Sequence, residues 1–293
     1  MSQPLILSGK EVARTVYQDL QPRIARLKAK GVTPGLAVIL VGDDPASRVY
    51  VRSKSRRFEN LDLISETFTY PADISQAQLL DQIGHLNHDP RFHGILVQMP
   101  LPSSLDEAAV IEAISPEKDV DGFHPYNVGR LTSGQPTFIP CTPKGILRIL
   151  SHYHLRLDGK HVVVVGRSNI VGRPLSILAS LKNPSGNATT TLCHSRTRDI
   201  FAHTSQADVV VAALGQAEFI RGEHVRDGVI LIDVGINRLA DSSEKGYHLT
   251  GDVHFPSAAE KAAAITPVPG GVGPMTIAML VENTVEAAEK LTA

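Results

Sequence analysis

The hydrophobic positions of the chain form short continuous runs that alternate with segments of helical spacing. Apolar runs over residues 36–41, 94–99 and 161–165 are each followed by Gly or Pro, and their length and β-branching are typical of buried strands. Between the first two runs, residues 46–60 and 73–86 carry apolar side chains three or four positions apart, which indicates helices. This alternation predicts parallel sheets with crossover helices, and therefore an α/β fold.

The second half of the chain repeats the same rhythm. Residues 143–152 have helical spacing, and four strand-like runs follow, at 161–165, 189–193, 209–214 and 229–234. Such a series is typical of a Rossmann-like, doubly wound parallel sheet that binds a dinucleotide. The intervening residues 116–143 are rich in Pro and Gly without a strong period, which indicates a linker that carries binding loops. Residues 275–291 are expected to form one amphipathic helix.

We therefore expect two α/β domains flanking a cleft. The first, catalytic domain is assigned to residues 1–139 together with the terminal helix at 275–293, and the Rossmann-like domain to residues 140–274.

Composition narrows the classes of protein that remain. Hydrophobic residues make up 42% and charged residues 20%, as in an ordinary globular protein, and the net charge of -1 gives no field that would favour nucleic acid or an anionic membrane. Two cysteines cannot build a disulfide framework, and no apolar run approaches the ~20 residues of a membrane span. The twelve histidines are scattered without metal-ligand spacing. We expect a cytoplasmic protein without a metal and without membrane or nucleic-acid partners.

A glycine-containing turn follows the strand predicted at 161–165. The sequence from Gly166 to Gly172 reads GRSNIVG and leads into an apolar segment of helical character. Strand, glycine turn and helix start offer a pyrophosphate close backbone approach, free N–H donors and the positive end of a helix. The spacing is GxSxxxG instead of GxGxxG, so a plain strand-to-helix turn without a ligand remains the alternative.

The end of the next predicted strand bears on which dinucleotide would bind. Sites for NAD usually place Asp or Glu there to bond the ribose 2′-hydroxyl, whereas residues 193–197 read CHSRT. A hydroxyl at Ser195 and a guanidinium at Arg196 suit a 2′-phosphate, and Arg167 in the turn is a second candidate. NADP is therefore favoured over NAD, with solvated loop arginines as the alternative.

Three polar side chains of the first half are candidates for chemistry. Tyr50 and Lys54 are four residues apart and share one face of the predicted helix, although such pairs also occur on solvated faces. The same spacing occurs in short-chain dehydrogenases, but there it follows the glycine turn and here it precedes it, which excludes that class. Gln98 lies in an otherwise apolar strand, where its amide needs partners; it either faces a ligand or bonds a neighbouring loop.

Two further segments carry weaker signals. Asp119 and Asp121 lie in the linker region, where carboxylates are commonly only solvated. The segment 267–274, PVPGGVGP, stands just before the terminal helix, and its density of Gly and Pro indicates a backbone shaped for close approach to something. A simple interdomain hinge is the alternative.

Taken together, five motifs in this order resemble one family along essentially the whole chain: YVRSK (50–54), VQMPLP (97–102), KDVDGFHPYNVGRL (118–131), GRSNIVGRP (166–174) and TPVPGGVGPMT (266–276). It is the bifunctional methylenetetrahydrofolate dehydrogenase/cyclohydrolase family. The resemblance implies NADP-dependent oxidation of 5,10-methylenetetrahydrofolate to the methenyl compound, followed by hydrolysis to 10-formyltetrahydrofolate in the same cleft. It also implies a homodimer.

The resemblance also implies roles for individual residues. Lys54 matches the family's catalytic lysine, which handles protons in the hydrolytic step, and Gln98 matches the glutamine that bonds this lysine and helps to hold it neutral. Tyr50 matches the residue that stacks on the folate ring system, and Asp121 the carboxylate that grips the amino-pyrimidine edge of the pterin.

Further contacts carry over in the same way. The expected additional substrate contacts are Val97, Met99, Pro269, Gly270, Gly271, Val272 and Gly273. The expected NADP contacts are Gly166, Arg167, Ser168, Ile170, Val171, Gly172, Ser195, Arg196, Gly215 and Ile236. Met99 stands where the family more often has leucine, a volume-conserving difference.

Three rival hypotheses remain at this point. A dehydrogenase for another substrate class, such as an amino acid, would leave the first-half motifs unexplained. A nucleotide-binding sensor would bind the cofactor without turnover, and a relative with one lost activity would lack Lys54 or the glycine turn.

Overall fold

The computed structural model describes residues 3–241 and 246–292, and contacts divide the chain into two compact units. One, the six-stranded unit, comprises the segment up to Arg14 and Thr142–Thr276. The other, the three-stranded unit, comprises Thr15–Cys141 and the segment from Ile277 on. The boundary between the units falls inside three helices, which are α1 (Gly9–Ala29), α6 (Cys141–His152) and α10 (Val272–Leu291).

The three-stranded unit is built on a parallel sheet in the order β3-β2-β4. The strands are β2 (Gly35–Val41), β3 (Ile64–Tyr70) and β4 (Gly94–Val97). All seven residues of the central strand β2 are buried, as expected for a strand covered on both faces. The register pairs Ile39 with Val97, and the N–H of Gln98 donates to the Ile39 carbonyl at 2.9 Å. The polypeptide after β4 therefore begins beside the end of β2.

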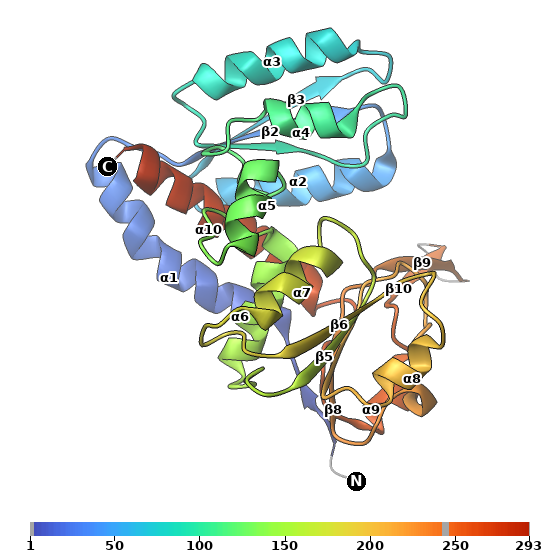
Figure 1. Cartoon of the computed structure of the whole chain (residues 1–293). Helices are drawn as coiled ribbons and strands as arrows, with labels where there is room; N and C mark the ends of the chain where they lie inside the picture. Colours follow the sequence, from blue (N-terminus) through green and yellow to red (C-terminus); the bar gives the residue numbers. More distant parts are fainter. Residues whose placement is uncertain (1–2, 242–245, 293) are drawn as a thin grey trace. The chain divides into compact units, whose positions relative to one another are not determined.

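Helices cover both faces of this sheet, and α2 and α3 lie on opposite sides of it (Figure 1). The helices of this unit between residues 45 and 132 are α2 (Pro45–Glu59), α3 (Gln76–His88), α4 (Glu107–Ala113) and α5 (Pro125–Thr132). Local chemistry defines their starts: Asp44 caps α2 by accepting the N–H of Ser47 at 2.7 Å, ahead of Pro45. Helix α5 lies within the segment 116–143 that the sequence analysis interpreted as a linker.

The six-stranded unit has a parallel sheet in the order β1-β11-β8-β7-β5-β6. The strands are β1 (Leu5–Ile6), β5 (His161–Val165), β6 (Thr189–Cys193), β7 (Val209–Ala212), β8 (Val229–Asp233) and β11 (Ala262–Ile265). The chain passes from β5 to β6 on one side and then returns to β7 on the other side of β5. A reversal of strand order of this kind opens a ligand-binding crevice at the carboxyl ends of the two strands.

Short elements complete the six-stranded unit. They are α7 (Gly172–Ser180), α8 (Ile200–Thr204), the 3₁₀ turn η1 (Gly222–His224), α9 (Phe255–Ala259) and the antiparallel pair β9 (Asn237–Ala240) and β10 (Tyr247–Thr250). The predicted fold class, an α/β protein with a Rossmann-like second domain, is confirmed.

The amino-terminal segment differs from the expected division of the chain. Residues 1–139 were expected in the first domain, but Leu5 and Ile6 pair with Ala264 and Ile265 and so extend the six-stranded sheet. A two-residue strand is too short to leave a hydrophobic pattern in the sequence. It forms because it pairs with β11, which lies some 260 positions further along the chain.

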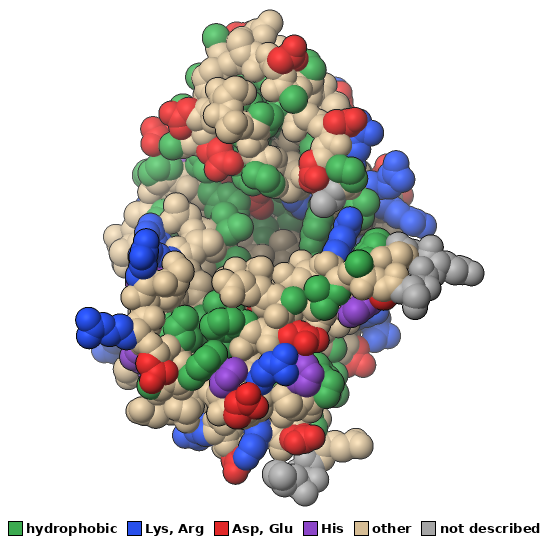
Figure 2. Space-filling model, turned by 90° about the vertical axis from the view of Figure 1, so that its right-hand side faces the viewer, with side chains coloured by type: hydrophobic (Ala, Val, Ile, Leu, Met, Phe, Trp, Pro, Cys, Tyr) green, Lys and Arg blue, Asp and Glu red, His purple; other side chains and the backbone are tan. Residues whose placement is uncertain are grey.

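The molecular surface shows no broad region of one charge on the face in Figure 2, where acidic and basic side chains are interspersed. This agrees with the net charge of -1. Within residues 3–241 and 246–292, no helix is both long and apolar enough to cross a membrane.

Candidate active site

Lys54 and Gln98 meet at the carboxyl end of the three-stranded sheet. Lys54 lies in α2, the helix after β2, and Gln98 directly follows β4, the neighbour of β2. The Lys54 Nζ donates to Gln98 Oε1 at 3.1 Å, and only 8% of Lys54 is exposed. Two residues that are 44 positions apart in the sequence therefore form the hydrogen-bonded pair that the family resemblance implied.

The Gln98 amide has a defined orientation. Its Nε2 donates to the Met99 carbonyl at 2.8 Å, so the other end of the amide, Oε1, is the end that faces Lys54. Because a carbonyl oxygen accepts but cannot donate, Gln98 can hold the amine only through one of the amine's own hydrogens. The lone pair or remaining hydrogens of Lys54 are thus left for another partner.

Asp121 lies close enough to Lys54 for the charge of the lysine to affect the pKa of the carboxyl. The half-buried Asp121 carboxyl has a pKa raised to about 6, chiefly because burial disfavours the charged form and despite the opposing effect of Lys54. Cys141 Sγ donates to Asp121 Oδ1 at 3.6 Å, which also favours the carboxylate. Asp119, by contrast, is buried and accepts the N–H groups of Phe123 and His124, so it shapes the turn.

Two buried residues support the backbone at Asp121, and the sequence analysis did not identify them. Asn283 in α10 donates through Nδ2 to the carbonyls of Val120, at 2.8 Å, and Ile139, at 3.1 Å. Cys141 Sγ also contacts the Val120 carbonyl, at 3.6 Å. A polar Asn inside an apolar helix segment was the signal that could have found this contact, because a buried amide requires partners.

The other predicted substrate contacts of the three-stranded unit are close in sequence to Lys54 or to Gln98. Tyr50 precedes Lys54 by one helical turn and is 42% exposed. Val97 is buried as the last residue of β4, and Met99 follows Gln98 and is linked to Pro100 by a cis peptide bond. Tyr50, Lys54, Gln98 and Asp121 thus all belong to one unit.

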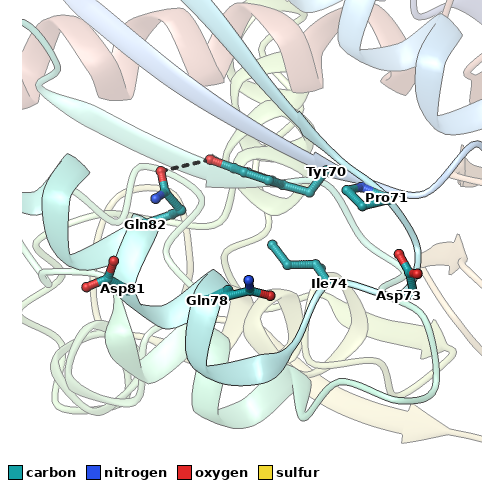
Figure 3. Close-up of a pocket in the computed structure, with 7 residues that line it drawn as sticks. All are labelled: Tyr70, Pro71, Asp73, Ile74, Gln78, Asp81 and Gln82. Carbon is teal, nitrogen blue, oxygen red and sulfur yellow. Dashed lines mark hydrogen bonds between the residues drawn. The ribbon is translucent and has the colours of Figure 1, made fainter.

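A separate pocket of about 460 Å³ lies at the carboxyl end of β3, between that strand and α3 (Figure 3). Its lining residues are Tyr70, Pro71, Asp73, Ile74, Gln78, Asp81 and Gln82, and Tyr70 donates to Gln82 Oε1 at 3.1 Å. No residue predicted to bind substrate or cofactor lines it. This pocket is therefore not the predicted folate site.

The glycine turn of the six-stranded unit lies at the strand-order reversal. Gly166 directly follows β5 and has a φ of 126°, a value that favours glycine. Its N–H donates to the Cys193 carbonyl at 2.9 Å, and a Cβ at this position would overlap the carbonyl oxygen of Ala213. The turn thus passes between the ends of β6 and β7 with no room for a side chain.

The start of α7 closes tightly on this turn. A Cβ at Gly172 would overlap the Gly166 carbonyl, so the second glycine is required for the helix to begin there. The Ser168 hydroxyl accepts the N–H of Val171 at 3.2 Å, while Arg167 and Ile170 are exposed. A bare backbone turn at a helix start, with exposed polar groups beside it, fits a dinucleotide pyrophosphate.

The residues predicted to meet a 2′-phosphate lie beside the turn. Strand β6 pairs with β5 up to Val165 and Cys193, so the segments that follow both strands leave the same sheet edge as neighbours. Ser195 and Arg196 are exposed in a turn closed by the Thr197 N–H, which donates to the His194 carbonyl at 2.8 Å. The side chains of Ser195 and Arg196 are thus exposed at the same sheet edge as the glycine turn.

The remaining predicted residues follow β7, β8 and β11 at this edge. Gly215 has a φ of 69°, and its N–H is already used by Asp252, at 2.9 Å. Ile236 is exposed, and its Cδ1 would lie 3.6 Å from a Cβ at Gly273. The last predicted contacts are Pro269, Gly270 and Gly271, which precede α10, and Val272 and Gly273, the first two residues of that helix. The N–H of Lys10 donates to the Gly270 carbonyl at 3.2 Å.

Fold and site together define a class: a two-unit α/β enzyme with a Rossmann-like dinucleotide unit and a lysine–glutamine pair in the other unit. Sequence models of the tetrahydrofolate dehydrogenase/cyclohydrolase family match residues 7–121, as its catalytic domain, and residues 140–292, as its NAD(P)-binding domain. The chain belongs to this family. It is a bifunctional oxidoreductase and hydrolase, and the predicted family is confirmed.

Individual relatives extend over nearly the whole chain. The bifunctional protein FolD of Geotalea uraniireducens (strain Rf4) is 53% identical over 97% of this chain and 99% of its own. The bifunctional protein FolD of Bacillus subtilis (strain 168) is also 53% identical, over 97% and 98%. The crystal structure of the Campylobacter jejuni methylenetetrahydrofolate dehydrogenase/cyclohydrolase has a TM-score of 0.92 at 46% identity, covering 98% of this chain and 99% of that one.

A second solved structure bears on the cofactor. The Trypanosoma brucei methylenetetrahydrofolate dehydrogenase-cyclohydrolase, complexed with NADP and an inhibitor, superposes with a TM-score of 0.94 at 37% identity. The alignment covers 100% of this chain and 99% of that one.

Proposed function

We propose that this chain oxidises 5,10-methylenetetrahydrofolate with NADP and then hydrolyses the product, 5,10-methenyltetrahydrofolate, to 10-formyltetrahydrofolate. The observation that carries the proposal is the Lys54–Gln98 hydrogen bond, at 3.1 Å, in a chain whose second unit matches a family NAD(P)-binding domain. The pair supplies the proton chemistry that hydrolysis needs, and the glycine turn supplies the cofactor site that oxidation needs.

Folate binding is proposed for Asp121 and Tyr50. The amino-pyrimidine edge of the pterin presents N–H donors, which two carboxylate oxygens of Asp121 can accept. The exposed Tyr50 ring offers a stacking surface for the ring system. Val97, Met99 and the loop from Pro269 to Gly273 are proposed as additional substrate contacts.

Lys54 is proposed to move protons in the hydrolytic step. Water adds to the cationic methenyl carbon and loses one proton, which gives a neutral hydroxyl adduct. As the bond from carbon to the ring nitrogen breaks, that nitrogen gains a proton and the hydroxyl loses its own to form the formyl carbonyl. The Lys54 amine can accept the first proton and deliver the second, while Gln98 holds it through a single hydrogen bond. The net result is one hydrogen ion released for each water consumed.

The hydride step requires no acid or base from the protein. NADP, when bound, accepts the hydride from the methylene carbon, and the protein has to align two carbons and exclude water. Gly166, Ser168, Val171 and Gly172 are proposed to hold the pyrophosphate, with Arg167, Ile170, Gly215 and Ile236 as further contacts. Ser195 and Arg196 are proposed to hold the 2′-phosphate.

A single assay tests both activities together. Purified protein is given 5,10-methylenetetrahydrofolate and NADP, and two wavelengths follow NADPH formation and methenyl decay in the same cuvette. Formation of NADPH with accelerated methenyl decay is the expected result. When methenyltetrahydrofolate is supplied directly, decay should continue without any NADP. Silence at both wavelengths would refute the proposed function.

Replacing Arg196 by Ala is expected to weaken the binding of NADP without weakening the binding of NAD. Loss of one charge-assisted hydrogen bond, about 1.5–3 kcal/mol, raises the KM for NADP roughly 10- to 100-fold. Ser195→Ala should act in the same direction by less, because a neutral hydroxyl contributes less than a guanidinium. The measurement is kcat/KM for both cofactors at constant ionic strength.

Arg198→Ala is the matched control for this prediction, since Arg198 is an exposed arginine two positions further along the same segment. It should leave both KM values unchanged. An equal loss with NAD and NADP in Arg196→Ala would contradict a role at the 2′-phosphate.

Two proposals concern assembly and location. Family resemblance leads us to propose a homodimer, which light scattering would contradict by reporting the 31.6 kDa mass of one chain. We also propose a cytoplasmic location, because Cys141 and Cys193 are both free thiols, as is usual in reducing compartments. Recovery of the protein outside the cytoplasmic fraction of its cells would contradict it.

A further inference from the structure

Two buried carboxylates lie behind the cofactor turn, and neither belongs to the predicted site. Asp233 ends β8 and is 3% exposed, and Asp252, just after β10, is 0% exposed. Ionised carboxylates are costly to bury unless hydrogen bonds replace the lost water. Burial and the neighbouring Asp252 charge raise the pKa of Asp233 to about 7, against the effect of the N–H groups that it accepts.

Asp252 ties together the segments that follow β7 and β8. Its Oδ2 accepts the backbone N–H groups of Leu214, at 2.6 Å, and Gly215, at 2.9 Å. Its Oδ1 accepts Nδ2 of Asn237, at 3.0 Å. Leu214 and Gly215 leave the sheet from β7, and Asn237 begins β9 directly after Ile236. One carboxylate thus bonds both segments that carry the proposed cofactor contacts, one at Gly215 and the other next to Ile236.

Asp233 holds the backbone that carries Asp252. Its Oδ1 accepts the N–H groups of Gly235 and Asp252, and its Oδ2 accepts that of Val253, all at 2.9 Å. The two side chains together accept five backbone N–H groups and one side-chain amide. A Cβ at Gly251 would overlap Asp233 Oδ2, so the close approach depends on glycine there.

The cofactor turn rests on the segment that Asp252 organises. Gly166 packs against the Ala213 carbonyl, and Ala213 immediately precedes the two N–H groups that Asp252 accepts. A shift of Leu214 and Gly215 would therefore displace the surface against which the glycine turn lies. The connection runs from Asp233 through Asp252 and the 213–215 segment to Gly166.

We propose that Asp252, held by Asp233, is a positioning residue for the dinucleotide site: it sets the 213–215 and 235–237 segments so that NADP is bound. This proposal rests on the proposed function, because it assumes that NADP occupies this edge of the sheet. Asp252 acts through the backbone and needs no contact with the cofactor. Its effect should therefore appear in cofactor affinity and not in the chemistry carried out around Lys54.

The test compares Asp252→Ala with Asp252→Asn. In the Ala variant, the N–H groups of Leu214 and Gly215 lose their charged acceptor, and a hydrogen bond to a charged group contributes about 1.5–3 kcal/mol, so the dissociation constant of NADPH should rise roughly 10- to 150-fold. In the Asn variant, the amide oxygen can still accept both N–H groups while Asn237 turns its own amide, so most of the affinity should return. NADPH binding is measured by fluorescence titration, and hydrolysis of methenyltetrahydrofolate without cofactor should match wild type in both variants.

A surface carboxylate of the same unit provides the matched control. Asp227 is exposed and pairs with Lys261 at 2.7 Å, so Asp227→Ala should leave NADPH affinity unchanged. Wild-type NADPH affinity in Asp252→Ala would overturn the proposal. Equal losses in the Ala and Asn variants would also overturn it, because the hydrogen bonds would then not be the cause. If hydrolysis and the amount of folded protein fell together with NADPH affinity, Asp252 would serve the stability of the fold in general, and the proposal would be overturned.

A milder variant keeps the proposal testable if Asp252→Ala fails to fold. Asn237→Ala removes only the side-chain donor to Asp252 Oδ1, and it should raise the NADPH dissociation constant several-fold while hydrolysis persists. An unchanged dissociation constant would then refute the proposal. Failure of the proposed function itself is distinguishable, because it would appear in the wild-type assay as absent NADPH formation.

Discussion

Replacing Lys54 by Met will abolish hydrolysis of 5,10-methenyltetrahydrofolate and leave NADP binding unchanged. Met approximates the length of the lysine side chain but has no group that accepts or donates a proton. General acid–base catalysis contributes about 10²- to 10⁴-fold, so the rate of methenyl decay should fall by at least ~100-fold. NADPH affinity should not change, because Lys54 and the glycine turn belong to different units.

The control for this variant is Arg56→Met. Arg56 lies in the same helix and is exposed, so its replacement should leave both activities at wild-type levels. Thermal unfolding of both variants should be recorded to verify that they are folded. A cyclohydrolase rate in Lys54→Met equal to that of wild type would remove Lys54 from the mechanism.

Replacing Asp121 by Asn will weaken folate binding in both activities. The amide presents an N–H₂ group where the pterin edge needs an acceptor, so kcat/KM for both folate substrates should fall roughly 10- to 100-fold, the equivalent of one charge-assisted hydrogen bond. Cofactor affinity should stay at the wild-type value. A loss confined to one of the two activities would contradict a role in binding their common ring system.

The wild-type enzyme should show the matching pH dependence. Burial raises the pKa of Asp121 to about 6, so the carboxylate predominates above that pH and is lost as the pH falls through it. Folate affinity, measured by calorimetry, should accordingly decline below pH 6 in wild type and remain flat in Asp121→Asn. In Lys54→Met the midpoint should move upward, because the Lys54 charge opposes the rise in the pKa of Asp121.

Buried strands were the elements that the sequence predicted best. The continuous apolar run at 161–165 coincides with β5, because a strand covered on both faces leaves an unbroken signal. The strand predicted at 189–193 coincides with β6, although that sequence, TTTLC, is mostly polar and β-branched. The terminal helix was predicted to begin at residue 275, but α10 begins three residues earlier, at Val272. Gly273 and Pro274 belong to its first turn, where Pro is tolerated.

Other elements escaped prediction for physical reasons. Strand β3, ISETFTY, lies at a sheet edge and carries polar residues, so it lacks a buried run. Helix α1 contains Pro22, which by itself indicates a helix break, yet the helix continues from Gly9 to Ala29. Part of the region between β9 and β10, residues 242–245, lies outside the described residues.

For the candidate site, the local patterns named residues but not their partnerships. The hydrogen bond between Lys54 and Gln98 was implied only by the family resemblance, because it depends on the parallel pairing of β2 with β4. Asp252 was not identified at all, because a single Asp in a loop is normally solvated and its partners come from two separate segments. Such long-range polar contacts leave no periodic pattern in the chain.

The support that Asn283 gives to the Val120 carbonyl has a consequence for biosynthesis. The backbone beside Asp121 is held by an amide more than 160 residues further along the chain, in the last helix. During translation, the strands and helices of residues 35–113 can form long before that helix has emerged from the ribosome. A nascent chain can therefore contain Lys54, Gln98 and Asp121 in folded surroundings without the final setting of Asp121. The backbone beside Asp121 therefore reaches its final setting only after α10 has been made and has packed against it.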